Sequence, residues 1–150
     1  SGNKILFLDR DGVVIEDTGY PNEINKLQFN FKIIENIIKF KLDKNFDACG
    51  FVTNQSGVSR GYFSEEEFWQ THDYIKNKCI KNNLKIDFTA VNFFQDPHYY
   101  RKPSPGMLES VIDHFLANRS SCYMIGDKNS DKVAAEVSKI NYISVENFNT

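Results

Sequence analysis

Residues 4–12 read Lys-Ile-Leu-Phe-Leu-Asp-Arg-Asp-Gly, a short apolar run that ends in two aspartates. A run of large apolar side chains that is too short for a helix is typical of a strand buried on both faces of a parallel sheet. Asp9 and Asp11 follow it directly, so they would stand at the carboxyl end of that strand. Open parallel sheets bind their ligands at this edge. The stretch therefore predicts a strand and a functional site at its end.

Strand-like and helix-like segments alternate along the rest of the chain. Pro105 suits the first turn of a helix, and Ser64 with Glu67 has the spacing of a capping box. Such alternation predicts an α/β fold, a Rossmann-like three-layer sandwich around a parallel five-stranded sheet, without a large cap domain. We expect residues 1–150 to form a single domain. The expected strands are residues 4–8, 46–53, 87–94, 121–126 and 140–145, and the expected helices are residues 31–42, 64–82, 105–118 and 130–138.

The composition excludes several classes of protein. Hydrophobic residues make up 41% of the 150 residues and charged residues 25%, as in globular domains rather than disordered chains. The apolar runs are too short to span a membrane. A net charge of -2 lacks the basic excess of domains that bind nucleic acid. Cys49, Cys79 and Cys122 lie far apart, which fits buried thiols in a reducing compartment. We expect a cytoplasmic protein without nucleic acid or membrane as partners.

The residues that could carry chemistry gather where the expected strands end. Because the carboxyl ends of parallel strands meet at one edge of a sheet, these side chains should lie close together. In chain order they are Asp9 and Asp11, then Thr53, Asn54, Gln55 and Ser56, then Arg101 and Lys102, and finally Asp127, Lys128 and Asp131.

This set of residues has the chemistry of phosphoryl transfer. Clustered carboxylates repel one another unless a hard cation joins them, and Mg²⁺ takes carboxylates together with water and phosphate oxygens. A hydroxyl and loop N–H groups can hold phosphate oxygens, a lysine can neutralise a transferring phosphoryl group, and a carboxylate can be the nucleophile. Each residue alone has a simpler interpretation: Asp9 and Asp11 as a turn, Lys102 as a solvated charge, Asp127 as a helix cap. The ordered combination favours a catalytic site.

With these residues the sequence resembles the haloacid dehalogenase-like hydrolases. The motifs that carry the resemblance are ILFLDRDG at residues 5–12, FVTN at 51–54, Lys102, and IGD at 125–127 followed by Asp131. The resemblance extends over residues 4–145. It implies a Mg²⁺-dependent phosphatase that acts through an aspartyl phosphate.

Three longer motifs are similar to one branch of this family. That branch contains phosphatases of D-glycero-D-manno-heptose 1,7-bisphosphate, which serve the synthesis of surface polysaccharides, and phosphatases of histidinol phosphate. The motifs are DRDG at 9–12, TNQSG at 53–57 and RKPSPGM at 101–107. The branch implies a small phosphorylated sugar as the substrate.

The resemblance also implies roles for the residues. Asp9 would attack phosphorus, and Asp11 would protonate the leaving oxygen and then activate water. Mg²⁺ would be held by Asp9, the backbone carbonyl of Asp11, and Asp127. Thr53 and Lys102 would bind the phosphoryl group, and Asp131 would orient Lys102 or support the metal site. The expected substrate contacts are Asn54, Gln55, Ser56, Arg60, Arg101 and Lys128.

The loop at residues 94–101 departs from the branch. It reads Phe-Gln-Asp-Pro-His-Tyr-Tyr-Arg and lacks the cysteines that hold a structural zinc in the branch, so we expect no zinc. An open site would take its specificity from the loops at residues 15–24, 54–62 and 95–101. Within the middle loop, Arg60 would hold a second phosphate or only brace the loop. We expect a monomer.

Two alternatives stay open. Histidinol phosphate is the second candidate substrate, although residues 19–24 and 59–63 are more similar to the heptose enzymes. A phospho-accepting receiver domain also carries Asp, Thr and Lys at strand ends, but its acceptor follows the third strand, where this chain has Gln95-Asp96-Pro97. The sequence favours a sugar-phosphate phosphatase and leaves open the anomer and the phosphate that is removed.

Overall fold

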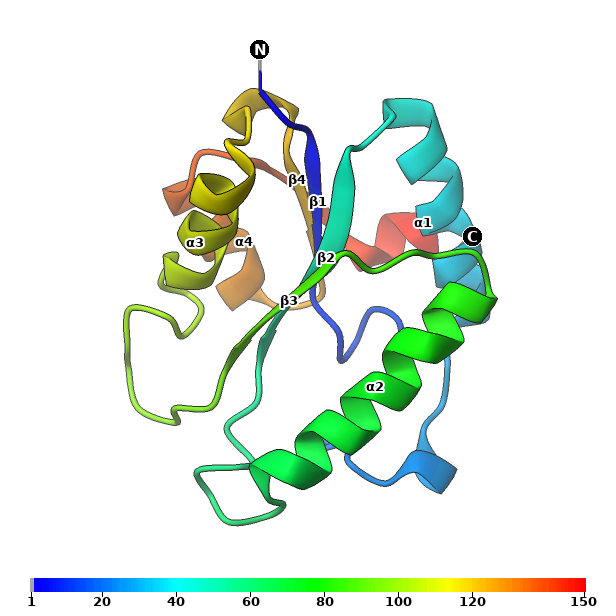
Figure 1. The fold of residues 1–150 in the computed structure, drawn as a ribbon, viewed down its shortest axis with the longest axis vertical. Helices are drawn as coiled ribbons and strands as arrows, with labels where there is room; N and C mark the ends of the chain where they lie inside the picture. Colours follow the sequence, from blue (N-terminus) through cyan, green and yellow to red (C-terminus); the bar gives the residue numbers. More distant parts are fainter. Residues whose placement is uncertain (1) are drawn as a thin grey trace.

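A parallel sheet runs through the middle of the computed structural model, which describes residues 2–150 (Figure 1). Its strand order is β3-β2-β1-β4-β5, and every neighbouring pair is parallel. The strands are β1 (Ile5–Leu8), β2 (Ala48–Asn54), β3 (Phe88–Asn92), β4 (Tyr123–Gly126) and β5 (Asn141–Ser144). The predicted α/β fold with a central five-stranded parallel sheet is confirmed.

Helices cover both faces of the sheet. They are α1 (Phe31–Lys44), α2 (Glu65–Lys81), α3 (Gly106–Phe115) and α4 (Asn129–Val137), with 3₁₀ turns η1 (Ile24–Lys26), η2 (Arg119–Ser121) and η3 (Val145–Phe148). In Figure 1, α3 and α4 lie on one side of the sheet, and α1 and α2 lie on the other. Among residues 2–150, no helix combines the length and the apolar character that a membrane crossing requires.

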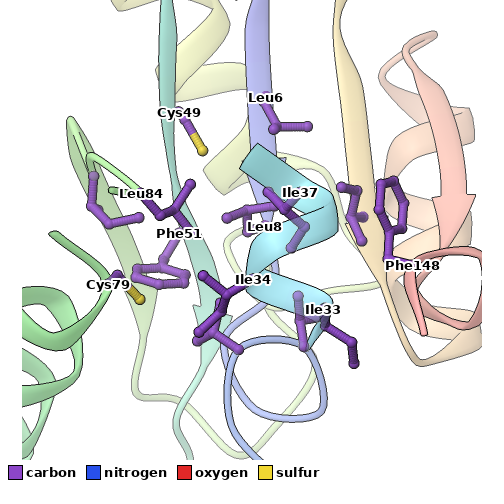
Figure 2. Close-up of a cluster of buried hydrophobic side chains, with 14 of the residues drawn as sticks. Leu6, Leu8, Ile33, Ile34, Ile37, Cys49, Phe51, Cys79, Leu84 and Phe148 are labelled. Carbon is purple, nitrogen blue, oxygen red and sulfur yellow. The ribbon is translucent and has the colours of Figure 1, made fainter. Parts of the chain in front are cut away.

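The central strand β1 supplies side chains to both layers of the core. Leu6 and Leu8 pack with residues of α1, α2 and η3, as Figure 2 shows for Ile34, Ile37 and Phe148. The alternate residues of β1 pack on the other face, against α3 and α4. All four residues of β1 are fully buried, which agrees with the uninterrupted apolar run. Asp9, which follows β1, is therefore anchored by a fully buried strand at the centre of the sheet.

Several element bounds differ from the expected ones for local reasons. Helix α3 ends three residues before the expected end, because Leu116 adopts the left-handed conformation with φ 49°. Strand β4 begins at Tyr123 rather than at residue 121, since η2 occupies the preceding residues.

The capping box is confirmed: Ser64 Oγ accepts from the backbone N–H of Glu67, and the Glu67 carboxylate accepts from that of Ser64.

Candidate active site

Most of the predicted site residues line one pocket at the carboxyl end of the sheet. The pocket has a volume of about 530 Å³. Those of the predicted set that line it are Asp9, Asp11, Thr53, Asn54, Gln55, Ser56, Arg101, Lys102, Lys128 and Asp131. Strand order explains the meeting, because Asp9 follows the central strand and the strands on either side of it end in Asn54 and Gly126.

Asp9 lines this pocket and is only 5% exposed. Burial raises the pKa of its carboxyl group well above the ordinary value, against the opposing charge of Lys102. The neighbouring carboxylates of Asp131, Asp11 and Asp127 raise this pKa further. The site thus concentrates negative charge around the residue expected to attack phosphorus.

Lys102 supplies the buried positive charge of the site. Its Nζ donates to Asp131 Oδ1 at 2.6 Å, to Asp9 Oδ1 at 3.1 Å and to the Val52 carbonyl at 3.0 Å. Burial alone would lower the pKa of the Lys102 ammonium, but the Asp9 and Asp131 carboxylates raise it above its ordinary value. Lys102 therefore stays charged and points at one oxygen of Asp9.

Asn54 holds the backbone of Lys102 in place. The side-chain carbonyl oxygen of Asn54 accepts from the backbone N–H of Lys102 at 3.2 Å, and its amide donates to the Lys102 carbonyl at 3.2 Å. This two-point contact fastens the loop after β3 to the end of β2. It aligns Lys102 with the nucleophile candidate on the neighbouring strand end.

Three carboxylates could contribute to a cation site. Asp9, Asp127 and Asp131 each offer an oxygen, and these oxygens lie within 4.8 Å of one another. Asp131 is already used, because its Oδ1 accepts from Lys102 and its Oδ2 accepts from two backbone N–H groups at the start of α4. Asp9 and Asp127 remain, and burial raises the pKa of Asp127 as well. This donor set fits a hard divalent cation such as Mg²⁺.

Gly12 makes room for Asp127. A Cβ atom on Gly12 would lie 2.0 Å from Oδ2 of Asp127, and the backbone of Gly12 has φ +88°. Both observations require glycine at this position. The turn after β1 and the carboxylate after β4 are therefore fitted to each other.

Asp11 is held at both of its carboxylate oxygens. Oδ1 accepts from Nε of Arg10 at 2.8 Å, and Oδ2 accepts from Nε2 of Gln55 at 3.0 Å. The same Gln55 amide donates to Oγ1 of Thr53 at 2.9 Å. Gln55 therefore joins the acid/base candidate to the hydroxyl expected to bind phosphate. Sequence reasoning did not assign Arg10 a role, because its second partner, His72 on α2, lies 62 residues further along the chain.

The three basic residues expected to contact substrate have different positions. Arg101 lines the pocket and donates from Nη1 to the Phe94 carbonyl at 2.8 Å. Lys128 also lines it and pairs with Asp17 at 2.8 Å. Arg60 is exposed, does not line the pocket, and donates from Nε to Oγ of Ser56 at 3.2 Å. The contact that the structure shows for Arg60 is thus one within its own loop.

The loop that departs from the expected branch is built on aromatic contacts. The His98 ring stacks on Phe94 with centroids 4.3 Å apart, and the Arg101 backbone N–H donates to the His98 carbonyl at 2.9 Å. Within residues 2–150, no cluster of three or more His, Cys, Asp or Glu side chains with metal-binding spacing includes His98. The absence of zinc stays a prediction.

Some lining residues escaped sequence reasoning. Asp17, Gly19 and Tyr20 line the pocket from the loop after β1, and Tyr20 packs edge-on against Tyr62 at 4.8 Å. The loop at residues 15–24 was expected to border the site, but nothing in its composition singled out these members. Tyr20 meets the loop after β2 and Asp17 pairs with Lys128 after β4, and only the folded chain shows these contacts.

Comparisons with known proteins agree with this chemistry. A family model described as HAD-hydrolase-like matches residues 99–147. The D-glycero-alpha-D-manno-heptose-1,7-bisphosphate 7-phosphatase of Photorhabdus laumondii is 32% identical over 146 residues, which cover 89% of this chain and 76% of that protein. The D-glycero-beta-D-manno-heptose-1,7-bisphosphate 7-phosphatase of the same organism is 35% identical over 152 residues, covering 93% and 78%.

A solved structure shares the fold. The D,D-heptose 1.7-bisphosphate phosphatase from B. bronchiseptica, complexed with magnesium and phosphate, superposes with a TM-score of 0.83. The two chains are 23% identical, and the match covers 93% of this chain and 78% of the other. At this identity the likeness concerns the arrangement of the strands and helices.

Proposed function

Since this chain belongs to the haloacid dehalogenase-like hydrolases and is a phosphoric monoester hydrolase, we propose that it removes one phosphate from D-glycero-D-manno-heptose 1,7-bisphosphate. The observation that carries the proposal is that one pocket contains two carboxylates with different hydrogen-bond partners. Asp9 is aligned by Lys102, and Asp11 is held by Gln55 beside Thr53. One carboxylate is thereby placed to attack and the other to exchange a proton. Because the chain is a phosphatase, the receiver-domain alternative is rejected.

In the first step, a carboxylate oxygen of Asp9 attacks phosphorus while the bond between phosphorus and the sugar oxygen breaks. The electron pair of that bond goes to the sugar oxygen, which takes a proton from Asp11. Lys102 and the hydroxyl of Thr53 stabilise the negative charge on the phosphoryl oxygens, together with the backbone N–H of Asn54. The products are the free sugar hydroxyl and an aspartyl phosphate on Asp9.

In the second step, water attacks the phosphorus of this aspartyl phosphate. Asp11, now a carboxylate, accepts the proton of the attacking water. The bond between phosphorus and the Asp9 oxygen breaks, which releases inorganic phosphate and restores the Asp9 carboxylate. Asp11 is then protonated again, ready for the next substrate.

Asp9, Asp127 and the backbone carbonyl of Asp11 would hold Mg²⁺. When bound, Mg²⁺ supplies positive charge that offsets the carboxylates and the phosphate. The crowded carboxylates, whose pKa values are raised by burial, support this assignment.

Polar residues that line the pocket would select the sugar. Arg101 and Lys128 bring positive charge to it, and Asn54, Gln55 and Ser56 bring amides and a hydroxyl. These groups suit a polyhydroxylated, phosphorylated substrate of small size. Arg60 is assigned to bracing its loop rather than to the second phosphate.

Phosphate release with Mg²⁺ tests the proposal on a matched panel of esters. The panel contains both anomers of the heptose bisphosphate, histidinol phosphate and simple sugar phosphates, with the Asp9→Asn protein as the blank. We expect a strong preference for one heptose anomer. The exposed Glu35, paired with Lys39 on the surface, provides a control variant, Glu35→Gln, with unchanged activity.

Preference for histidinol phosphate would move the substrate to the second candidate of the branch. Equal, slow hydrolysis of every ester would contradict the heptose assignment. Measurable Mg²⁺-dependent turnover by Asp9→Asn would overturn the nucleophile. We also propose a monomer in the cytoplasm, and size-exclusion chromatography checks the oligomeric state.

A further inference from the structure

Arg10 is a charged residue without access to solvent. Its side chain is 1% exposed, although both of its neighbours in the chain, Asp9 and Asp11, line the pocket. A buried guanidinium is costly unless it is paired and hydrogen-bonded. Among the described residues, its one ion pair is with Asp11, from Nε to Oδ1 at 2.8 Å. The chain therefore buries a cation next to Asp11, the proposed proton donor.

The other arm of Arg10 reaches a histidine on helix α2. Nη1 of Arg10 lies 3.3 Å from Nδ1 of His72, and Nε2 of His72 lies 2.8 Å from Oγ1 of Thr89. A guanidinium has only donors, so Nδ1 of His72 must be the acceptor. The proton of the neutral ring is then on Nε2 and points to Thr89. The network itself assigns this tautomer.

Burial keeps this histidine neutral. It lowers the pKa of His72 to about 3, and the positive charges of Arg10 and Lys76 contribute. An acceptor that stays unprotonated at neutral pH is a permanent partner for Arg10. His72 therefore remains an acceptor for the guanidinium at neutral pH.

An aromatic ring packs against the guanidinium as well. The Arg10 guanidinium carbon lies 5.2 Å from the centre of the Phe68 ring, and His72 stacks on the same ring at 5.3 Å with an interplanar angle of 15°. Planar cations favour such contacts. Arg10 is thus restrained by a ring, by an acceptor on one arm and by a carboxylate on the other.

We propose that Arg10, oriented by His72 and Thr89, is a positioning residue that holds the Asp11 carboxyl group toward the leaving oxygen of the substrate. The inference rests on the proposed function, in which Asp11 protonates that oxygen. Arg10 does not line the pocket, so it acts only through Asp11.

The remaining hydrogen-bonding capacity of Asp11 agrees with this role. Arg10 occupies one site on Oδ1, and Gln55 occupies one site on Oδ2. A carboxylate has about four lone-pair sites, so each oxygen keeps one free for the transferred proton. Rotation of the carboxyl group would break both hydrogen bonds. The group is therefore held in one orientation and stays able to exchange a proton.

The experiment compares two esters that differ in their need for a proton. Cleavage of the heptose ester releases a sugar alcohol, whose oxygen needs a proton from Asp11. Cleavage of p-nitrophenyl phosphate releases a stable anion that needs no such proton. We would measure kcat/KM, which covers the steps up to the first phosphoryl transfer, for wild type, Arg10→Met and Arg10→Lys. Arg119→Lys is the matched control, since Arg119 pairs with Glu109 outside the pocket.

Arg10→Met should lower kcat/KM for the heptose ester by about 10²-fold and that for p-nitrophenyl phosphate by less than about 10-fold. Arg10→Lys keeps the charge but cannot contact both Asp11 and His72, so it should show the same asymmetry. A merely structural role would lower both values equally. Equal losses, or no loss for either ester, would overturn the proposal.

A second pair of variants decides the matter if Arg10→Met does not fold. His72→Leu removes the acceptor and keeps the Arg10 charge, so it should reduce heptose hydrolysis more than p-nitrophenyl phosphate hydrolysis. His72→Asn returns an acceptor near the position of Nδ1 and should restore the lost selectivity in part. Equal losses for both esters in His72→Leu would reject the positioning role.

Failure of the proposed function has a separate signature. If wild type hydrolyses neither ester with Mg²⁺, the phosphatase assignment of the site is wrong. If wild type hydrolyses both and the Arg10 variants show no asymmetry, only the positioning role is wrong.

Discussion

The Nζ of Lys102 lies 2.6 Å from Oδ1 of Asp131, and both side chains are almost completely buried. Lys102→Met would leave the Asp131 and Asp9 carboxylates without their counter-ion. Removing one partner of a buried pair costs about 3–5 kcal/mol, so the free energy of unfolding in urea should fall by about that amount. The rate constant for hydrolysis should fall by about 10²-fold or more, because charge stabilisation of the phosphoryl group is lost.

The double variant Lys102→Met/Asp131→Asn separates these two effects. Asparagine keeps an oxygen that can accept from the backbone N–H groups of Asp127 and Lys128. The double variant should regain part of the lost stability and none of the lost activity. A double variant no more stable than Lys102→Met would argue against the buried charge as the cause.

Mg²⁺ should stabilise the protein against heat. A ligand that binds only the folded state at 100 times its Kd adds about 2.7 kcal/mol, which corresponds to a rise in Tm of roughly 5–10 °C for a chain of this size. Asp127→Asn should abolish most of this rise, since it removes an expected ligand. Glu35→Gln serves as the surface control and should respond like wild type. An undiminished rise in Asp127→Asn would remove Asp127 from the metal site.

Gly12→Ala should weaken Mg²⁺ binding through a steric effect. The added Cβ would lie 2.0 Å from Oδ2 of Asp127, so the carboxylate must move. Gly61→Ala is a matched control, because Gly61 has a similar φ of +79° but nothing within 4 Å of the added Cβ. Both variants incur a backbone cost of about 1–2 kcal/mol.

The Mg²⁺ concentration for half-maximal activity distinguishes the two glycine variants. It should rise in Gly12→Ala and stay at the wild-type value in Gly61→Ala. The same shift in both would attribute the effect to backbone strain rather than to displacement of Asp127.

Purified protein should contain no stoichiometric zinc. The loop at residues 94–101 contains no cysteine, and its His98 stacks on Phe94. Elemental analysis checks the content, and a zinc-selective chelator should leave Tm unchanged. One zinc per chain would mean that the ligands come from outside this loop.

The fold and the location of the site follow from local patterns. The apolar run before Asp9 and the alternation of segments are local signals, and they were sufficient to predict a parallel sheet. Because parallel strands end at one edge, the same patterns also brought Asp9, Thr53 and Lys102 together. Helix ends were less predictable, since the left-handed residue Leu116 carries no strong sequence signal for a stop.

The partners of individual charges could not be predicted. Arg10 and His72 are 62 residues apart in the chain, and Lys128 and Asp17 are 111 residues apart. Which carboxylate or ring a cation meets depends on how the helices and loops pack, not on spacing along the chain. For the same reason the contact of Arg60 with Ser56, in its own loop, could only be found in the folded structure.

The central strand also divides the protein by local stability. β1 is hydrogen-bonded to strands on both sides, and each of its residues is fully buried, so its amides should exchange with solvent only when the whole sheet opens. The exposed segments at residues 16–20 and 94–100 should open at much lower cost. The nucleophile candidate thus directly follows the strand expected to exchange most slowly, whereas Arg101, one of the residues expected to contact the sugar, ends a loop expected to exchange fast. Substitutions in these loops can therefore change the preferred sugar without altering the strand that positions the reacting carboxylate.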